Sequence, residues 1–403
     1  MPSACLTRVD PAPPDPILGL GEAFKADPRP DKINLSVGVY QDDRGVTPVL
    51  PSVLEAERRL LQAESTKTYK PMTGDADLAD AVQRLVLGEA SSLAREGRVV
   101  TAHTPGGTGG LRVVGDFLRH CLPDSTLWLS DPTWANHAGV FDAAGVPTRS
   151  YPYFDAETRG LAFDRMLETL AGVGRGDVVL LHGCCHNPTG VDPTPDQWAA
   201  IADTLAQRDA LPLIDFAYQG FAEGLDEDAA GVRRLVEKLP EAIVVASFSK
   251  NFGLYRDRAG AAMFIAETRD AADAVASRVK LAIRRNYSNP PAHGGEIVKT
   301  ILHDAKLCGQ WIDEVAAMRG RIHTVRGQLV EALDARGVSL APQGNRFIAE
   351  QRGMFSFSGL NRDQVQQLRD DHGVYIVGSG RINVAGVTSA NLETLARAIA
   401  AVA

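Results

Sequence analysis

The chain of 403 residues is long enough to bury a large core and exceeds the usual size of a single domain. Its apolar content of 44% and charged content of 23% are those of an ordinary globular protein, and no apolar run reaches the roughly 18 residues of a membrane span. The net charge of −8 argues against general nucleic-acid binding. Because the five cysteines lack framework spacing and the first residues lack a signal-peptide pattern, we expect a cytoplasmic protein.

Residues 1–14 are rich in proline, which disfavours helix, so they predict an extended arm. Between about residues 98 and 265, short apolar runs alternate with helical stretches. The expected strands are 98–101, 127–130, 178–182, 211–215, 242–247 and 259–265. Helices are expected at 111–118 and from the cap near Thr194. The apolar runs are continuous rather than alternating, which favours an α/β fold with a mainly parallel sheet covered by helices on both faces.

A long helical region from about Asp304 to Arg336 leads into a mixed C-terminal part. Strands are expected there near 354–357 and 374–377, and a final helix from Ser389. We interpret this part as a smaller α/β domain that the segment before residue 45 completes. The predicted division is therefore an arm over 1–14, a smaller domain over 15–45 and 320–403, and a larger domain over 46–319.

The segment Ser247–Arg258, with the sequence SFSKNFGLYRDR, follows the expected strand 242–247. Its Lys250 lies where open α/β sheets bind their ligands, at the carboxyl end of a strand. Lysine forms a Schiff base with an aldehyde, and arginine and serine side chains bind phosphate. The segment therefore indicates pyridoxal phosphate.

A glycine-rich turn, TPGGTGG at residues 104–110, precedes one of the expected helices. Glycine lets the backbone approach a phosphate, and a helix N-terminus favours negative charge. A dinucleotide site is the alternative, but Arg112 stands where its third glycine would lie. Taken alone, the segment is explained equally well as a plain tight turn.

The segment HGCCHNPTG at residues 182–190 carries two histidines and two cysteines. Structural zinc sites separate their ligand pairs by a longer stretch of chain, so no metal is expected here. Asn187 precedes a Pro-Thr-Gly turn and is interpreted as a hydrogen-bonding group above the sheet.

Two further places carry charged groups at strand ends. Asp215 ends an apolar strand, and Tyr218 follows it. An aspartate there commonly caps the next turn, but beside a pyridine nitrogen it would keep the ring protonated and strengthen it as an electron sink. Arg381 begins a short apolar strand, and arginine binds a carboxylate through two parallel hydrogen bonds. Together with Arg284, it suggests a substrate with two carboxylates.

These segments resemble the class I pyridoxal-phosphate aminotransferases, specifically the aspartate/aromatic subgroup. The similarity runs from NLSVGVY at residues 34–40 to RINVAG at 381–386, and the motifs HNPTG and SFSKNFGLY are specific to this group. The resemblance implies the fold type I architecture, with a mostly parallel seven-stranded sheet flanked by helices and a smaller α/β domain.

The resemblance also implies roles for individual residues. Lys250 would hold the cofactor as a Schiff base and shuttle the proton between substrate Cα and cofactor, Asp215 would pair with the pyridinium nitrogen, and Tyr218 would bond the ring oxygen. The other implied cofactor contacts are Gly107, Thr108, Trp134, Asn187, Ser247, Arg258 and, across a dimer interface, Tyr69. The implied substrate contacts are Gly38, Trp134, Asn187, Arg381 and, across the interface, Arg284. His137, which would orient Asp215, and His182 are implied supports.

The implied activity is ping-pong transfer of the amino group of aspartate to 2-oxoglutarate by a homodimer with active sites at its interface. Residues that match the aspartate-selective branch are Val39, Thr47, Thr108 and Asn289. Gln41 and Thr68 match neither branch, so tyrosine and phenylalanine remain alternative substrates. A serine acyl-enzyme built on Ser247 and Lys250 lacks its companion motifs, and the arginine pair argues against a β-lyase.

Overall fold

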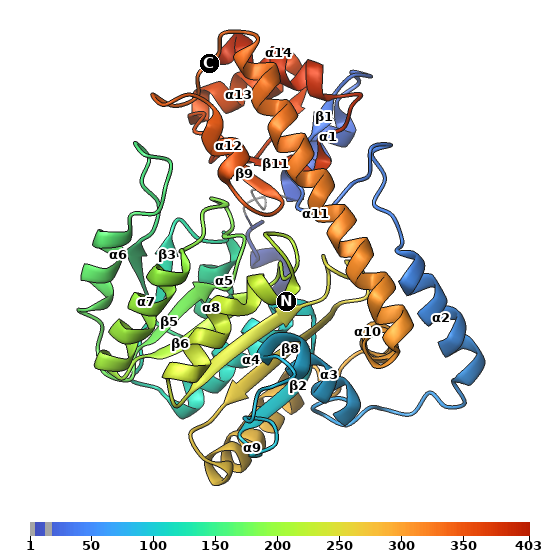
Figure 1. The fold of residues 1–403 in the computed structure, drawn as a ribbon, viewed down its shortest axis with the longest axis vertical. Helices are drawn as coiled ribbons and strands as arrows, with labels where there is room; N and C mark the ends of the chain where they lie inside the picture. The colour runs from blue at the N-terminus through green and yellow to red at the C-terminus, as the bar shows by residue number, and fades with distance from the viewer. Residues whose placement is uncertain (1–4, 13–17) are drawn as a thin grey trace.

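The computed structural model describes residues 5–12 and 18–403. Its centre is a seven-stranded sheet in the order β2-β8-β7-β6-β5-β3-β4 (Figure 1). The strands are β2 (Val99–Pro105), β3 (Leu127–Asp131), β4 (Thr148–Pro152), β5 (Val178–His182), β6 (Leu211–Phe216), β7 (Ala242–Ser247) and β8 (Ala259–Ile265). β8 runs antiparallel to β2 and β7, whereas the other neighbours are parallel. The predicted α/β class with a mostly parallel sheet is confirmed.

The continuous apolar runs arise because both faces of the sheet are covered. Successive side chains of a strand point to opposite faces. In β5, Leu180 belongs to the core on one face and Leu181 to the core on the other; in β7, Val245 and Val244 divide in the same way. The central strands β5 and β7 therefore carry apolar residues at successive positions rather than at alternate ones.

Two sets of helices cover these faces. The first set packs with the core of Leu180 and consists of α4 (Gly106–Cys121), α5 (Asn136–Ala143) and α9 (Arg269–Asn286). The second set contributes to the opposite core and consists of α3 (Ala76–Leu87), α6 (Phe163–Leu170), α7 (Pro195–Arg208), α8 (Leu225–Lys238) and α10 (Ala292–His303). α2 (Pro51–Ala63) packs on α10 and on the long α11 (Ala305–Asp334).

The sequence and the structure differ in detail at two elements of the sheet region. β4 was not among the strands expected from the sequence, because its first three residues are exposed at the sheet edge and polar. α4 begins at Gly106, earlier than the expected residue 111, since the glycine-rich segment itself forms the first turn. The expected cap of α7 is present as a capping box between Thr194 and Gln197.

Residues 18–40 meet the C-terminal part of the chain away from the large sheet, at the top of Figure 1. We call residues 18–40 and 338–403 the terminal cluster. Its elements are α1 (Leu18–Ala26), β1 (Ile33–Asn34), α12 (Arg346–Glu350), β9 (Phe355–Phe357), α13 (Arg362–His372), β10 (Val374–Tyr375), β11 (Arg381–Asn383), η2 (Val384–Gly386) and α14 (Leu392–Val402). β1 pairs with β10 and β9 with β11. The domain boundaries at residues 45 and 320 stay a prediction.

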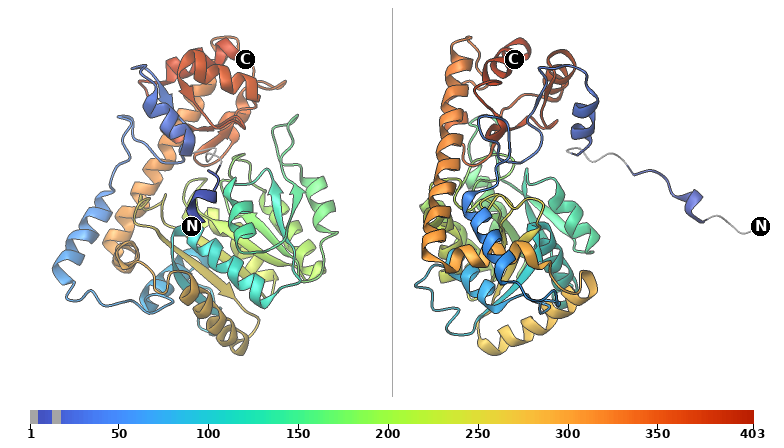
Figure 2. Two further views of the ribbon diagram at one scale, coloured as in Figure 1. Left: turned by 180° about the vertical axis from the view of Figure 1, so that it is seen from behind. Right: turned by 90° about the vertical axis from the view of Figure 1, so that its right-hand side faces the viewer.

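Residues 5–12 lead away from the rest of the molecule (Figure 2). They include the short 3₁₀ helix η1 (Cys5–Arg8). The sequence predicted an extended arm, and the described part of it is therefore not extended throughout. Residues 1–4, 13 and 14 of the predicted arm, and 15–17 of the predicted smaller domain, lie outside the described residues. Among the helices of 5–12 and 18–403, none is long and apolar enough to cross a membrane.

Candidate active site

The carboxyl ends of the parallel strands open onto one cavity of about 590 Å³. His182 at the end of β5 is in register with Asp215 of β6, and Ser247 ends the neighbouring β7. The turn after β7 adds Lys250. The cavity is lined by Val37, Gly38, Gly107, Thr108, Leu111, Trp134, Ala135, Asn136, His182, Asn187, Asp215, Ala217, Tyr218, Ser247, Ser249, Lys250, Tyr255, Arg258, Phe355 and Arg381.

Lys250 loses its proton more readily than an ordinary lysine. Its Nζ lies 4.7 Å from the ring centroid of Tyr218. Burial lowers the pKa of Lys250 to about 8; the Asp215 carboxylate opposes this shift, and Arg258 and Arg381 add to it. A neutral amine is the form that attacks a carbonyl carbon.

Asp215 keeps its negative charge although it is largely buried. Burial raises the pKa of its carboxyl, but the hydrogen bond and charge of His137 outweigh burial, and the pKa is lowered. Nε2 of His137 lies 3.0 Å from Oδ2 of Asp215. Oγ1 of Thr133 lies 2.8 Å from Nδ1 of His137 and 3.2 Å from Nε2 of His182. A fixed carboxylate therefore faces the cavity beside Lys250.

One end of the cavity gathers groups that bind anions. It lies at the N-terminus of α4, where a Cβ on Gly107 would come within 3.1 Å of Cβ of Ser247. Arg258 donates from Nη1 to Oγ of Ser249 at 3.4 Å, and Oγ of Ser247 lies 3.3 Å from that hydroxyl. A guanidinium, two hydroxyls and a helix N-terminus at a glycine backbone suit a phosphate.

Arg381 also lines the cavity and is almost fully buried. Its Nη1 donates to Oδ1 of Asn187 at 3.1 Å, its Nη2 donates to the Ser36 carbonyl at 2.7 Å, and its Cζ lies 4.2 Å from the ring centroid of Phe355. Burial lowers the pKa of Arg381, and its Nε has no partner within the described residues. No carboxylate there pairs with this guanidinium, so an anionic ligand would complete it.

Tyr69 and Arg284 do not line this cavity within one chain. The side chain of Tyr69 is 89% exposed, and Arg284 is exposed with a hydrogen bond to Oγ of Ser288. All other residues to which the sequence assigned a direct contact with cofactor or substrate do line the cavity. The two absent residues are those expected from a partner subunit.

The family model described as "Aminotransferase class I and II" matches residues 30–399. The chain belongs to this family. An aspartate aminotransferase of Salmonella typhi is 50% identical over 97% of this chain and 98% of its own length. An aromatic-amino-acid aminotransferase of Pseudomonas aeruginosa is also 50% identical, over 98% of each chain. The solved structure of an aromatic-amino-acid aminotransferase from Burkholderia pseudomallei, covalently bound to pyridoxal phosphate, is 47% identical, with a TM-score of 0.95 over 99% of both chains.

The structure of this aminotransferase also adds residues that sequence reasoning missed. Tyr255 lies in the segment 247–258 and lines the cavity. It was assigned no contact from the sequence, because a phenol at this position does not indicate one particular contact with cofactor or substrate. Phe355 lies in an expected strand and underlies Arg381. Alternation along β9 could have indicated which of its residues turn inward, but not that one meets an arginine of another strand.

The paired cysteines of this aminotransferase lie close to a carboxylate. Ligand atoms of Cys184, Cys185 and Asp228 fall within 4.8 Å of one another. The Asp228 oxygens already accept hydrogen bonds from the backbone N–H groups of Gly220, Ala222, Glu223 and Gly224. The carboxylate therefore fixes the turn before α8, and the two thiols have no further ligand in this group.

Proposed function

We propose that this aminotransferase moves the amino group of aspartate to 2-oxoglutarate in a ping-pong cycle, giving oxaloacetate and glutamate, with pyridoxal 5′-phosphate as cofactor. One observation carries the proposal: Lys250 and Asp215 line a single cavity between an anion-binding end at Arg258 and an unpaired Arg381. The names of the relatives support the same reaction class and include both aspartate and aromatic substrates.

The residues around the cavity fit this cofactor. Thr108, Ser247 and Arg258 would hold the phosphate, and the missing Cβ of Gly107 leaves room for the backbone to approach it. Asp215 would hold the proton on the ring nitrogen. The remaining proposed contacts are Trp134 against the ring, Asn187 and Tyr218 on the ring oxygen, and Tyr69 of the second copy on the phosphate. Pyridoxal phosphate, when bound, supplies an aldehyde that takes up the amine and a ring that delocalises the electrons of the broken C–H bond.

Lys250 has two tasks in this proposal. Its neutral amine would hold the cofactor, and the same nitrogen would take the proton from the substrate Cα. The lowered pKa suits both tasks, since each requires the unprotonated amine. Asp215 remains ionised throughout, because His137 holds its pKa down against burial.

Substrate orientation falls to charged and amide groups. Arg381, steadied by Asn187, would bind the α-carboxylate, with Gly38 and Trp134 closing around it. Arg284 of a second copy would bind the distal carboxylate. With both carboxylates of the diacid bound, its Cα–H bond would stand perpendicular to the plane of the cofactor ring. This orientation would favour loss of that proton over cleavage of another bond.

This arrangement needs a homodimer. Apolar side chains are exposed on α2 and beyond it: Leu54 is 53% exposed and Leu61 84%, and Tyr69 follows in the chain. Leu6 and Val9 of the arm are exposed as well. A second copy would cover these side chains and bring its Tyr69 and Arg284 to the cavity. The cytoplasm stays the predicted compartment.

A broader range that includes tyrosine and phenylalanine is the second candidate, favoured by the aromatic-amino-acid relatives. The deciding experiment compares kcat/KM for aspartate, tyrosine and phenylalanine, each with 2-oxoglutarate. We expect aspartate to have the highest value. A higher value for phenylalanine than for aspartate would make the second candidate the correct one.

A further inference from the structure

A short strap, residues 35–40, borders the active-site cavity, and its Val37 and Gly38 line it. Its start is firmly rooted in the terminal cluster. The strap follows β1, and the backbone N–H of Leu35 donates to the Tyr375 carbonyl at 2.8 Å. The strap is thus a cavity wall whose position is set by neighbouring elements.

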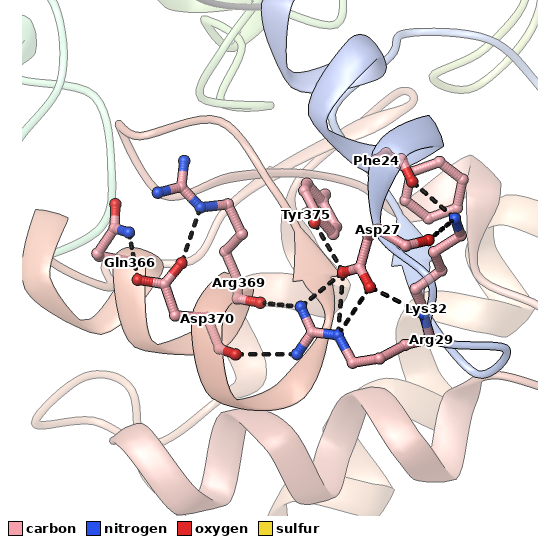
Figure 3. Close-up of polar contacts among 8 residues, drawn as sticks. All are labelled: Phe24, Asp27, Arg29, Lys32, Gln366, Arg369, Asp370 and Tyr375. Carbon is pink, nitrogen blue, oxygen red and sulfur yellow. Dashed lines mark hydrogen bonds and ion pairs between the residues drawn. The ribbon is translucent and has the colours of Figure 1, made fainter.

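An ion pair before β1 also fixes the start of the strap (Figure 3). Arg29 donates from Nη2 to Oδ2 of Asp27 at 2.6 Å, and the hydroxyl of Tyr375 donates to the same carboxylate at 2.8 Å. Arg29 also donates to the carbonyls of Arg369 and Asp370 at the end of α13. These contacts fix where the strap starts but do not reach its apex at Gly38.

The side chain of Asn383 donates hydrogen bonds to both carbonyls that flank the apex. Its Nδ2 donates to the carbonyl of Val37 at 2.8 Å and to that of Val39 at 2.8 Å. The N–H of Val39 also donates to the Val37 carbonyl at 3.0 Å, so Gly38 is the centre of a tight three-residue turn. Asn383 is only 2% exposed and does not line the cavity.

The same turn is packed against the arginine site. A Cβ on Gly38 would lie 2.7 Å from Cζ of Phe355, so the turn rests directly on that ring. Phe355 also contacts Arg381, whose guanidinium stands over the ring. Arg381 and Asn383 are the two ends of β11 and reach the strap at the Ser36 carbonyl and around Gly38, respectively.

The choice of residue type at position 383 is informative. Oδ1 of Asn383 is buried without a partner, whereas both hydrogens of its amide nitrogen are used. A buried acceptor without a partner is unfavourable, so the two donated bonds must outweigh it. An apolar side chain of the same shape would remove both donated bonds and leave the Val37 carbonyl with the N–H of Val39 alone.

We propose that Asn383 is a positioning residue for carboxylate binding: by holding the strap apex on β11, it fixes Gly38 and Arg381 relative to each other around the carboxylate that all substrates share. The inference rests on the proposed function, because it assumes that Arg381 binds the substrate carboxylate. It predicts that loss of Asn383 weakens substrate binding without weakening cofactor binding, since the phosphate end and Lys250 belong to other elements.

The test uses the cofactor-loaded enzyme and the variant Asn383→Leu, which keeps the shape and removes the donors. Calorimetry measures the Kd of succinate, a dicarboxylate without an amino group, and absorbance measures the Kd of the cofactor. We expect the succinate Kd to rise about tenfold, as loss of one to two buried hydrogen bonds implies, with the cofactor Kd unchanged. KM for aspartate and for phenylalanine should rise by a similar factor, because both carry the α-carboxylate.

Asn345→Leu is the matched control. Asn345 is equally buried in the terminal cluster, and its Nδ2 donates to Oδ1 of Asp334 and to the Val338 carbonyl, away from the strap. It should lower Tm as Asn383→Leu does and leave the succinate Kd unchanged. An unchanged succinate Kd in Asn383→Leu would overturn the inference. An equal rise of the succinate Kd in both variants would overturn it as well.

A second variant and a second measurement guard against misfolding. Asn383→Ser also removes the amide donor but adds no apolar bulk, and it should give the same direction of change. Hydrogen exchange measured by mass spectrometry should be faster in a peptide covering residues 35–40 and unchanged in one covering 104–110. If the unaltered enzyme neither binds succinate nor turns over aspartate, the proposed function fails; if it does both and the Asn383 variants match it, only the positioning role fails.

Discussion

Oδ2 of Asp215 lies 3.0 Å from Nε2 of His137, and this contact is the last in a chain of hydrogen bonds with a fixed direction. The chain begins at the backbone N–H of Asn187, which can only donate and which faces Nδ1 of His182 at 3.4 Å. His182 then donates from Nε2 to Thr133, the threonine hydroxyl can donate to Nδ1 of His137, and Nε2–H of His137 donates to Asp215. The Nε2–H of His137 thus satisfies the buried carboxylate.

Replacing His137 by leucine should raise the pKa of Asp215. Burial alone raises the pKa of this carboxyl, and His137 supplies the largest opposing effect. Asp215 would then take up a proton at a higher pH, so the acidic limb of kcat/KM against pH should move upward. The pH profile of the loaded enzyme measures this. An unmoved acidic limb with merely lower activity would assign His137 a packing role only.

Thr133 should matter through its hydroxyl alone. Thr133→Val keeps the shape but removes the link between the two histidines, whereas Thr133→Ser keeps the link. We expect Val to lower kcat by about threefold to tenfold, the effect of losing one to two hydrogen bonds, and Ser to stay close to the unaltered enzyme. Steady-state kinetics with aspartate checks this, and equal activity of the two variants would contradict the directional chain.

The pH at which the cofactor-free protein captures pyridoxal phosphate should reflect Lys250. Because the pKa of its amine is lowered to about 8, the reactive neutral form appears as the pH rises through 8 rather than through the ordinary value of 10.5. The rate of Schiff-base formation, followed by stopped-flow absorbance, should therefore rise with an apparent pKa near 8. Lys250→Ala should give no such phase and almost no turnover. A rate that rises only near 10.5 would refute the lowered pKa.

Much of this arrangement could be predicted from the sequence, because the ends of the strands can be recognised there. Asp215 and Ser247 each close a continuous apolar run, and parallel strands bring such ends to one edge. β4 gave no such signal, since its exposed residues are polar and it is stabilised by pairing with β3. The contact of Asn383 with the strap could not be predicted from the sequence either. The side chain donates to the backbone carbonyls of Val37 and Val39, which are far away in the sequence. Because every residue has a backbone carbonyl, the residue types at these positions do not indicate the contact.

Arg284→Ala should separate the two substrate classes. If Arg284 binds the distal carboxylate, its loss should lower kcat/KM for aspartate by about 10- to 100-fold, the effect of losing a charge-assisted hydrogen-bonded pair. Phenylalanine has no distal carboxylate, so its kcat/KM should change by less than about threefold. Arg285→Ala, at the neighbouring exposed arginine, is the matched control. Equal losses for both amino acids would place Arg284 outside the substrate site.

Mixing two inactive variants should restore activity if the site is shared between subunits. Arg284 and Lys250 belong to different regions of one chain, and only Lys250 lines its cavity. In a mixed dimer of Lys250→Ala and Arg284→Ala chains, one site would combine the intact lysine of one chain with the intact arginine of the other. The second site would carry both lesions.

Random exchange of equal amounts of the two chains would make about half of the dimers mixed, each with one intact site. Aspartate turnover should therefore recover to about one quarter of that of the unaltered enzyme, after subtraction of the residual activity of each parent dimer. Each variant refolded or exchanged alone is the control. If both residues served the cavity of their own chain, no mixture would contain an intact site, and activity would stay at the average of the two parents.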